Sequence, residues 1–127
     1  MAHTLTEAQM AQALIPALLE FREKIDPEMP VQQLLTFLIA ARTPGITMQD
    51  AMKELDITSA SISRNVAALG RINRFHQPGH DLVQATEDPM ERRRKVMELT
   101  THGKQFAKRV AEIFNKQMQI IEKRSGA

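Results

Sequence analysis

The stretch EDPMERRRKVMELTTHGK, residues 87–104, predicts a β-hairpin followed by a helix. Asp88-Pro89 favours a turn, and the short alternating segments on either side of it, residues 82–87 and 94–99, are typical of strands. Thr100 or Thr101 can then cap a long final helix. Apart from Gln117, the positions that share one face of that helix are apolar: Phe106, Val110, Ile113, Phe114, Met118 and Ile121.

The tip of the predicted hairpin is strongly basic, with four consecutive cations at residues 92–95. A basic tip can reach the minor groove of DNA, where narrow AT-rich segments concentrate negative potential and attract arginine. Asp88 and Glu91 can brace the turn and orient guanidinium groups through bidentate pairs. The alternative is a charged turn that only faces solvent. We predict that three arginines of the tip contact DNA: Arg92, Arg93 and Arg94.

Upstream of the hairpin, two short helices joined by a brief turn predict a helix-turn-helix. Thr47-x-x-Asp50 caps the first helix, which turns Ala51 and Leu55 inward. Asp56-Ile57-Thr58 separates it from the second helix, residues 59–70. Three apolar residues form the inner face of that second helix: Ile62, Val66 and Leu69.

The opposite side of the second helix carries short polar side chains and one arginine. Arginine matches the two acceptors of guanine, asparagine matches the acceptor and donor of adenine, and hydroxyls at a helix start can bind phosphate. The alternative is a polar face that meets only solvent, because helix-turn-helix patterns are short. The residues we predict to read bases or phosphates are Ser59, Ser61, Arg64 and Asn65.

Two further helices are expected before the helix-turn-helix. Thr4-x-x-Glu7 has the order of a capping box and precedes a helix that Pro16 interrupts. Residues 26–30 form a connection, Pro30 opens the second helix, and Pro44-Gly45 ends it. Leu14, Leu18, Phe21 and Ile25 share one stripe of the first helix, and Val31, Leu34, Leu35, Leu38 and Arg42 share one face of the second.

Composition is that of one folded domain. The chain has 127 residues, 43% of them hydrophobic and 25% charged, and the absence of cysteine excludes disulfides, thiolate metal ligands and thiol nucleophiles. Residues 1–58 carry four basic and eight acidic side chains, whereas residues 59–127 carry thirteen and seven. A basic half of this kind attracts polyanions such as nucleic acid. Without a secretory signal or an apolar run long enough to span a bilayer, a cytoplasmic location is expected, in a bacterium or a bacterial host.

Together these stretches resemble the winged helix-turn-helix of the MarR family of bacterial regulators, over residues 31–114. Asp88, Glu91 and Arg93 fit the acidic and arginine pattern of that family's wing, and Leu99-Thr100 with Gly103 fits the start of its next helix. Ser61-x-Ser63-Arg64 is similar to the start of its recognition helix. Two features depart from the pattern. Met90 stands where many members have another arginine, and residues 71–81 form a longer connection than is usual.

The resemblance implies a mainly α fold with a small β-hairpin wing. Residues 1–127 would form one domain in which residues 1–25 and 101–124 are dimerisation helices and residues 30–99 are the DNA-binding lobe. It further implies a homodimeric regulator of double-stranded DNA, acting as a repressor, with a small lipophilic effector as a possible ligand. The alternative is a winged-helix interaction or architectural module in a replication, packaging or regulatory assembly, which reads no specific sequence.

Neither catalysis nor a resident cofactor is expected. No Gly-x-Ser-x-Gly elbow surrounds the serines, and the five scattered glycines form no phosphate-binding loop. His76, His80 and Asp81 lie close along the chain, but three ligands without an evident fourth are weak support for a zinc site. We therefore expect no metal at this loop.

Overall fold

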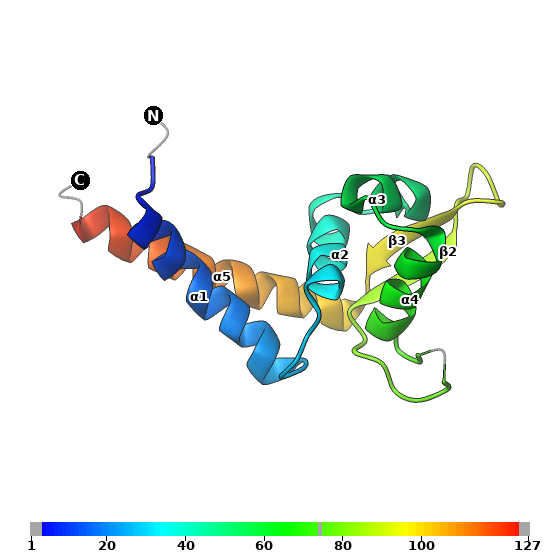
Figure 1. Ribbon diagram of the computed structural model, residues 1–127, viewed down its shortest axis with the longest axis horizontal. Helices are drawn as coiled ribbons and strands as arrows, with labels where there is room; N and C mark the ends of the chain where they lie inside the picture. The colour runs from blue at the N-terminus through cyan, green and yellow to red at the C-terminus, as the bar shows by residue number, and fades with distance from the viewer. Residues whose placement is uncertain (1–3, 74, 125–127) are drawn as a thin grey trace. The chain divides into compact units, whose positions relative to one another are not determined.

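The computed structural model describes residues 4–73 and 75–124 (Figure 1). It contains five α-helices and three short β-strands within these residues. The elements in chain order are α1 (Glu7–Lys24), α2 (Val31–Arg42), β1 (Ile46–Thr47), α3 (Met48–Leu55), α4 (Ser59–Leu69), β2 (Val83–Glu87), β3 (Lys95–Leu99) and α5 (Thr101–Arg124). This order is the predicted mainly α fold with a hairpin wing.

The chain divides into two compact units, which we describe separately. The winged unit comprises the described residues from 29 to 106, with α2, α3, α4, the three strands and the first turn of α5. The helical unit comprises the described residues within 1–28 and 107–127, which are α1 and the rest of α5.

A three-stranded antiparallel sheet, in the order β1-β3-β2, forms one side of the winged unit. The register of the hairpin pairs Val83 with Leu99 and Glu87 with Lys95, and β1 extends the sheet by pairing Ile46 with Met97. The hairpin was predicted to within one residue at each strand start. The strand β1 was not predicted, because two residues carry no alternation that could mark them.

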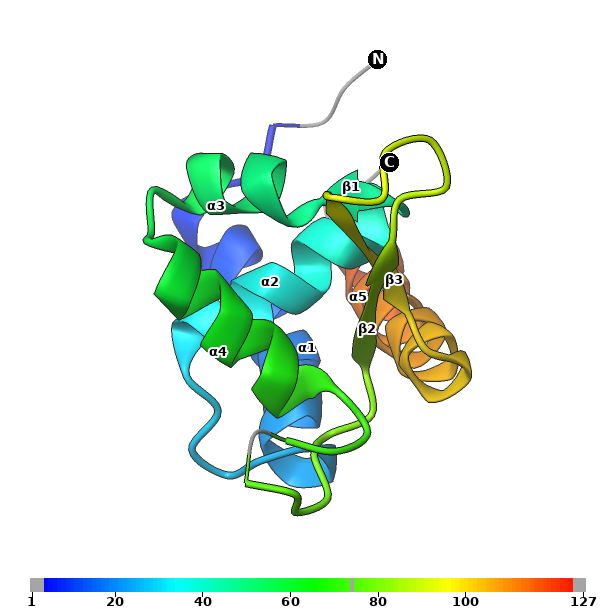
Figure 2. The same cartoon turned by 90° about the vertical axis from the view of Figure 1, so that its right-hand side faces the viewer.

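The core of the winged unit lies between α2, α4 and the sheet, whose arrangement Figure 2 shows. Leu69, Leu82, Val83 and Met97 have no accessible surface left. The rings of Phe37 and Phe106 meet edge to face, with centroids 5.8 Å apart. Burying these large side chains is the main stabilising contribution in a unit of this size.

The face of α2 that enters this core is not the face that the sequence predicted from the spacing of its valine and leucines. Thr36, Phe37, Ile39 and Ala40 are buried, whereas Val31, Leu35 and Leu38 are exposed. Thr36 is tolerated inside because its hydroxyl donates to the carbonyl of Gln32 at 2.7 Å. The helix is therefore apolar nearly all round, and the spacing of its leucines marks the side that the winged unit leaves uncovered.

The first helix begins two residues later than its predicted capping box. Thr6, not Thr4, is the N-cap: its Oγ1 accepts from the N–H of Gln9 at 3.2 Å, and Gln9 Oε1 accepts from the N–H of Thr6 at 3.0 Å. Glutamine closes this reciprocal box as well as glutamate does. The helix then runs on through Pro16 to Lys24, so the interruption predicted at this proline is not found.

In the helical unit, two alanines and Phe21, the one buried member of the predicted stripe, form the apolar part of the buried side of α1. Ala13, Ala17 and Phe21 are buried, while Leu14 and Leu18 of the predicted stripe are exposed. Polar contacts also join α1 to α5: Gln12 Nε2 donates to Gln117 Oε1 at 3.4 Å, and Arg109 Nε pairs with the buried carboxylate of Glu20 at 3.2 Å. The leucines of α1 are thus left exposed on its other side.

No helix in the described part of the chain is long and apolar enough to cross a membrane.

Candidate nucleic-acid interface

The helix-turn-helix is capped at the start of both helices, and the sequence predicted the first of these caps. Thr47 Oγ1 caps α3 by accepting from the N–H of Asp50 at 3.0 Å. Asp56 then takes a left-handed conformation, with φ 54° and ψ 50°, and the chain turns into α4. Thr58 Oγ1 caps α4 by accepting from the N–H of Ser61 at 3.1 Å. The short turn between the two helices is therefore fixed at both ends.

At the exposed start of α4, hydroxyls and one guanidinium form a chain of contacts. The Thr58 hydroxyl donates to Ser61 Oγ at 3.0 Å, and Arg64 Nη2 donates to the same oxygen at 3.3 Å. Ser59 and Arg64 are exposed and Ser61 is half-buried, so these three lie where the sequence placed them. A guanidinium held over a helix start can form a bidentate contact with a guanine edge.

Asn65 does not face outward, and this prediction was wrong. Its side chain is buried, and its Nδ2 donates to Oε1 of Gln32 on α2 at 3.3 Å. The helical position next to Val66 turns Asn65 toward α2, where a buried amide needs a polar partner. Asn65 thus joins α4 to α2 instead of facing a ligand.

The loop between β2 and β3, which we call the wing tip (residues 88–94), is organised around Asp88. This buried residue donates its N–H to the Arg94 carbonyl at 2.9 Å and accepts the Met90 N–H on Oδ1 at 3.0 Å. Its Oδ2 pairs with Arg94 Nη2 at 3.0 Å. Asp88 therefore braces the turn as predicted, and the guanidinium that it orients is that of Arg94.

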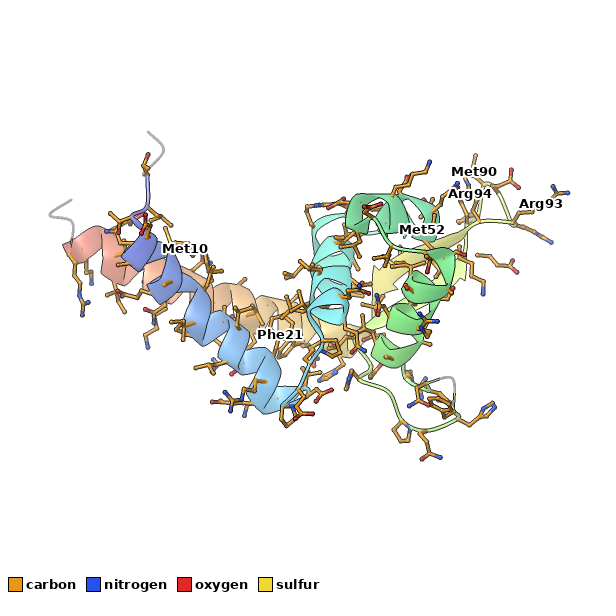
Figure 3. The ribbon with its side chains drawn as sticks, in the orientation of Figure 1. Met10, Phe21, Met52, Met90, Arg93 and Arg94 are labelled. Atoms are coloured by element: carbon orange, nitrogen blue, oxygen red, sulfur yellow. The ribbon has the colours of Figure 1, made fainter. Side chains whose placement is uncertain are left out.

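The remaining contacts of the wing tip come from the backbone. Glu91 donates its N–H to the Asp88 carbonyl at 3.2 Å, and Arg94 donates its N–H to the Glu91 carbonyl at 3.0 Å. Arg92 and Arg93 are exposed, and Figure 3 shows Met90 and Arg93 at the far end of the loop. The tip is a closed turn on which all three arginines are exposed, and Arg94 is also paired with Asp88.

A groove of about 630 Å³ separates the start of α4 from the wing and is bordered on a third side by α3. Ser59 and Ser63 of α4 line it opposite Arg93, Arg94 and Lys95 of the wing. Its floor is apolar, with Met52 of α3 and Ile62 and Val66 of α4 among the lining residues. The groove thus gathers hydroxyls and cations that are about thirty residues apart in sequence.

Sequence reasoning missed the contribution of α3 to this groove. Thr47, Met48, Gln49 and Met52 line it, although none belongs to the recognition helix or the wing. Only the packing of α3 against α4 brings them there, and no local pattern indicates it. At the loop that carries His76, His80 and Asp81, the Asp81 carbonyl oxygen lies 3.1 Å from Nδ1 of His102 on α5. Within residues 4–73 and 75–124, no three His, Asp or Glu side chains gather as a metal site requires.

An ion pair joins α3, which borders the groove, to α2. Arg42 of α2 and Glu54 of α3 form two hydrogen bonds of 2.7 Å each, in a bidentate geometry. The hydrogen bond from Arg42 lowers the pKa of the Glu54 carboxyl below its usual range, and the same bond raises the pKa of Arg42. Both groups are exposed, so solvent screens the attraction.

No family model and no curated protein sequence matches the chain. Solved structures do match its fold. The MepR chain in a MepR–DNA complex of S. aureus is 22% identical in sequence to this chain. The match covers 94% of this chain and 86% of the MepR chain, with a TM-score of 0.64. The PcaV transcriptional regulator of Streptomyces coelicolor with its natural ligand is 20% identical (95% and 83% covered, TM-score 0.56). MarR is 15% identical (93% and 81% covered, TM-score 0.58). The chain therefore has the winged-helix fold of MarR-type transcriptional regulators.

Proposed function

We propose that this chain is a transcriptional regulator that binds double-stranded DNA sequence-specifically as a homodimer and acts as a repressor. The observation that carries the proposal is the groove, because it gathers the hydroxyls at the start of α4 and the cations of the wing within one unit. A helix start with a neighbouring basic hairpin suits a duplex whose major groove takes the helix and whose minor groove takes the wing. The MepR structure, which shares the fold, was solved as a DNA complex.

Each polar residue of the interface then has a distinct role. Arg64 reads a base edge, and Ser59 and Ser61 bind phosphate near the helix start. Arg92, Arg93 and Arg94 hold the wing on the minor groove, and Arg94 also pairs with Asp88. Asn65 has no part in this contact set, because its side chain is buried against Gln32.

The homodimer is supported by the uncovered side of α1. Five large apolar residues of this helix are between 38% and 54% exposed: Met10, Leu14, Ile15, Leu18 and Leu19. A continuous apolar surface of this kind marks a protein–protein interface. A second copy of the chain suits it because two-fold dimers are the commonest assemblies and would present two recognition helices to one face of DNA.

A small lipophilic effector and a bacterial cytoplasmic setting complete the proposal. The PcaV structure, of the same fold, was solved with its natural ligand. Binding of such a ligand would change DNA affinity only as far as it favours one of two conformations of the dimer. The proposal assigns no catalytic residue and no cofactor.

The first test is a selection from random duplex oligonucleotides. Enrichment of a pseudo-palindrome with half-sites about 10–10.5 base pairs apart, or a multiple of that spacing, is expected from a two-fold dimer. Tight binding to protein partners with no enriched motif would instead favour the interaction module. An observation that favours the module is the exposure of Ile72 and Phe75 between α4 and β2.

The second test compares Arg64→Ala and Arg93→Ala on the selected site and on a scrambled one. Arg64→Ala should cost about 1–3 kcal/mol per contact on the selected site and relax one base position in each half-site. Arg93→Ala should weaken both sites alike and flatten the slope of log K against log salt by about one unit per lost phosphate contact. Lys116→Ala, which removes an exposed charge of the helical unit, is the control. Wild-type affinity of both arginine variants at every salt concentration would refute the interface.

A further inference from the structure

Met90 is the most solvent-exposed large apolar residue in the described chain, at 89%. It follows the exposed Pro89 at the wing tip, so two apolar side chains stand at the end of a hairpin that is otherwise charged. A single exposed methionine needs no explanation on an ordinary surface. Met90, however, stands at the outermost turn of a basic hairpin, and this position does require an explanation.

The wing tip holds Met90 in a defined place. Asp88 Oδ1 accepts the Met90 N–H at 3.0 Å, and the same carboxylate is anchored by Arg94 at 3.0 Å. The backbone bonds from Asp88 to Arg94 and from Arg94 to Glu91 close the turn on the other side. A side chain presented by a braced turn loses less backbone freedom on binding than one on a loose loop.

The charge around Met90 favours a nucleic-acid surface over an apolar pocket on another protein. Residues 92–95 are four cations, and the three arginines among them are exposed. Figure 3 shows Arg93 and Arg94 on the same loop as Met90. Proteins that bend DNA place apolar side chains, methionine and proline included, between base steps of the minor groove, with cations on the flanking backbone. The wing tip has both parts of such a device.

Resting on the function proposed above, we propose that Met90, with Pro89 beside it, is an apolar wedge that enters the minor groove and partly unstacks a base step flanking the recognition site. The wing then distinguishes DNA sequences by how easily their base steps deform, as well as by the electrostatic potential of a narrow minor groove. Pyrimidine–purine steps, TA and CA/TG, kink most readily. Such steps are therefore the preferred sequence at the position that meets the wing.

The experiment uses the full chain and three variants: Met90→Leu, which keeps an apolar side chain; Met90→Gln, of similar length but polar; and Met90→Arg. Each is taken through the same random-oligonucleotide selection. Wild type and Met90→Leu should enrich TA or CA/TG steps in both flanks. Met90→Gln and Met90→Arg should lose that enrichment while keeping the central palindrome.

A second readout measures unstacking directly, with 2-aminopurine placed at the flanking step of the selected duplex. Its fluorescence should rise on binding of wild type and Met90→Leu, and this rise should be lost with Met90→Gln. Flanking enrichment and fluorescence that are unchanged in Met90→Gln would overturn the wedge and leave the regulator in place. Failure of wild type to enrich any motif would overturn both proposals, so the two failures are distinguishable.

Discussion

Gly103, in the first turn of α5, shows how closely the base of the wing packs against the next helix. A Cβ at this position would overlap the carbonyl oxygen of Leu82. Because this oxygen belongs to the backbone, it cannot move aside by a change of side-chain rotamer. The Thr100 hydroxyl fixes the same turn by accepting the Gly103 N–H at 2.9 Å and donating to the Asp81 carbonyl at 2.6 Å. The glycine is therefore required by space, not by an unusual φ.

We expect Gly103→Ala to lower the free energy of unfolding by about 1–3 kcal/mol, because α5 must move away from β2 to make room. Urea denaturation followed by circular dichroism measures the change. Gly70→Ala is the matched control: its φ is −79° and the nearest atoms to a Cβ are 3.5 Å away, so it should cost little. Equal stability of Gly103→Ala and wild type would show that the contact is not tight in solution.

Single residues also mark where sequence reasoning succeeded and where it failed. Thr47 was predicted as a cap and Thr100 was one of two candidates for another, because capping depends on neighbours within three residues. Asn65 was placed on the wrong side because its partner, Gln32, lies 33 residues earlier. A polar residue at the edge of an apolar face can turn either way, and only the presence of a distant partner decides.

At the scale of elements, the hairpin and the helix-turn-helix could be predicted, since alternation, turn residues and caps are local signals. The strand β1 and the groove-lining side of α3 could not, because both depend on pairing or packing with distant segments. The spacing of leucines on α2 did identify a face, but the core took the opposite one, which carries Phe37 and Ala40. Periodicity locates an apolar face without saying which of two such faces will be covered.

The ion pair between α2 and α3 predicts a pH dependence. Because the folded state lowers the pKa of Glu54, its pairing with Arg42 stabilises the fold above the unfolded-state pKa and stops doing so as the pH falls through the folded-state value. Glu54→Gln should therefore lower the melting temperature slightly near neutral pH and leave it unchanged in acid. Thermal melts over a pH series measure this. Glu23→Gln, at an exposed position of α1, is the control, and a difference that grows in acid would contradict the assignment.

At the scale of the whole molecule, the uncovered apolar side of α1 predicts self-association. The full chain should be a dimer at micromolar concentration in light scattering, and the double variant Leu14→Glu with Leu18→Glu should be a folded monomer, because buried carboxylates without partners are strongly disfavoured at an interface. Glu23→Ala on the same helix should remain dimeric. A monodisperse monomer of the unaltered chain would remove this part of the proposal.

The division of the chain into two units also sets an order of events during folding. The winged unit is drawn from one continuous segment, whereas the helical unit joins partners such as Gln12 with Gln117, 105 residues apart, and Glu20 with Arg109, 89 apart. Closing such long loops in an unfolded chain is entropically costly and slow, and prior folding of the segment between them shortens the effective loop. During synthesis, α1 emerges long before its partner helix exists. We therefore expect the winged unit to fold first, and α1 to remain without its partner residues Gln117 and Arg109 until α5 is complete.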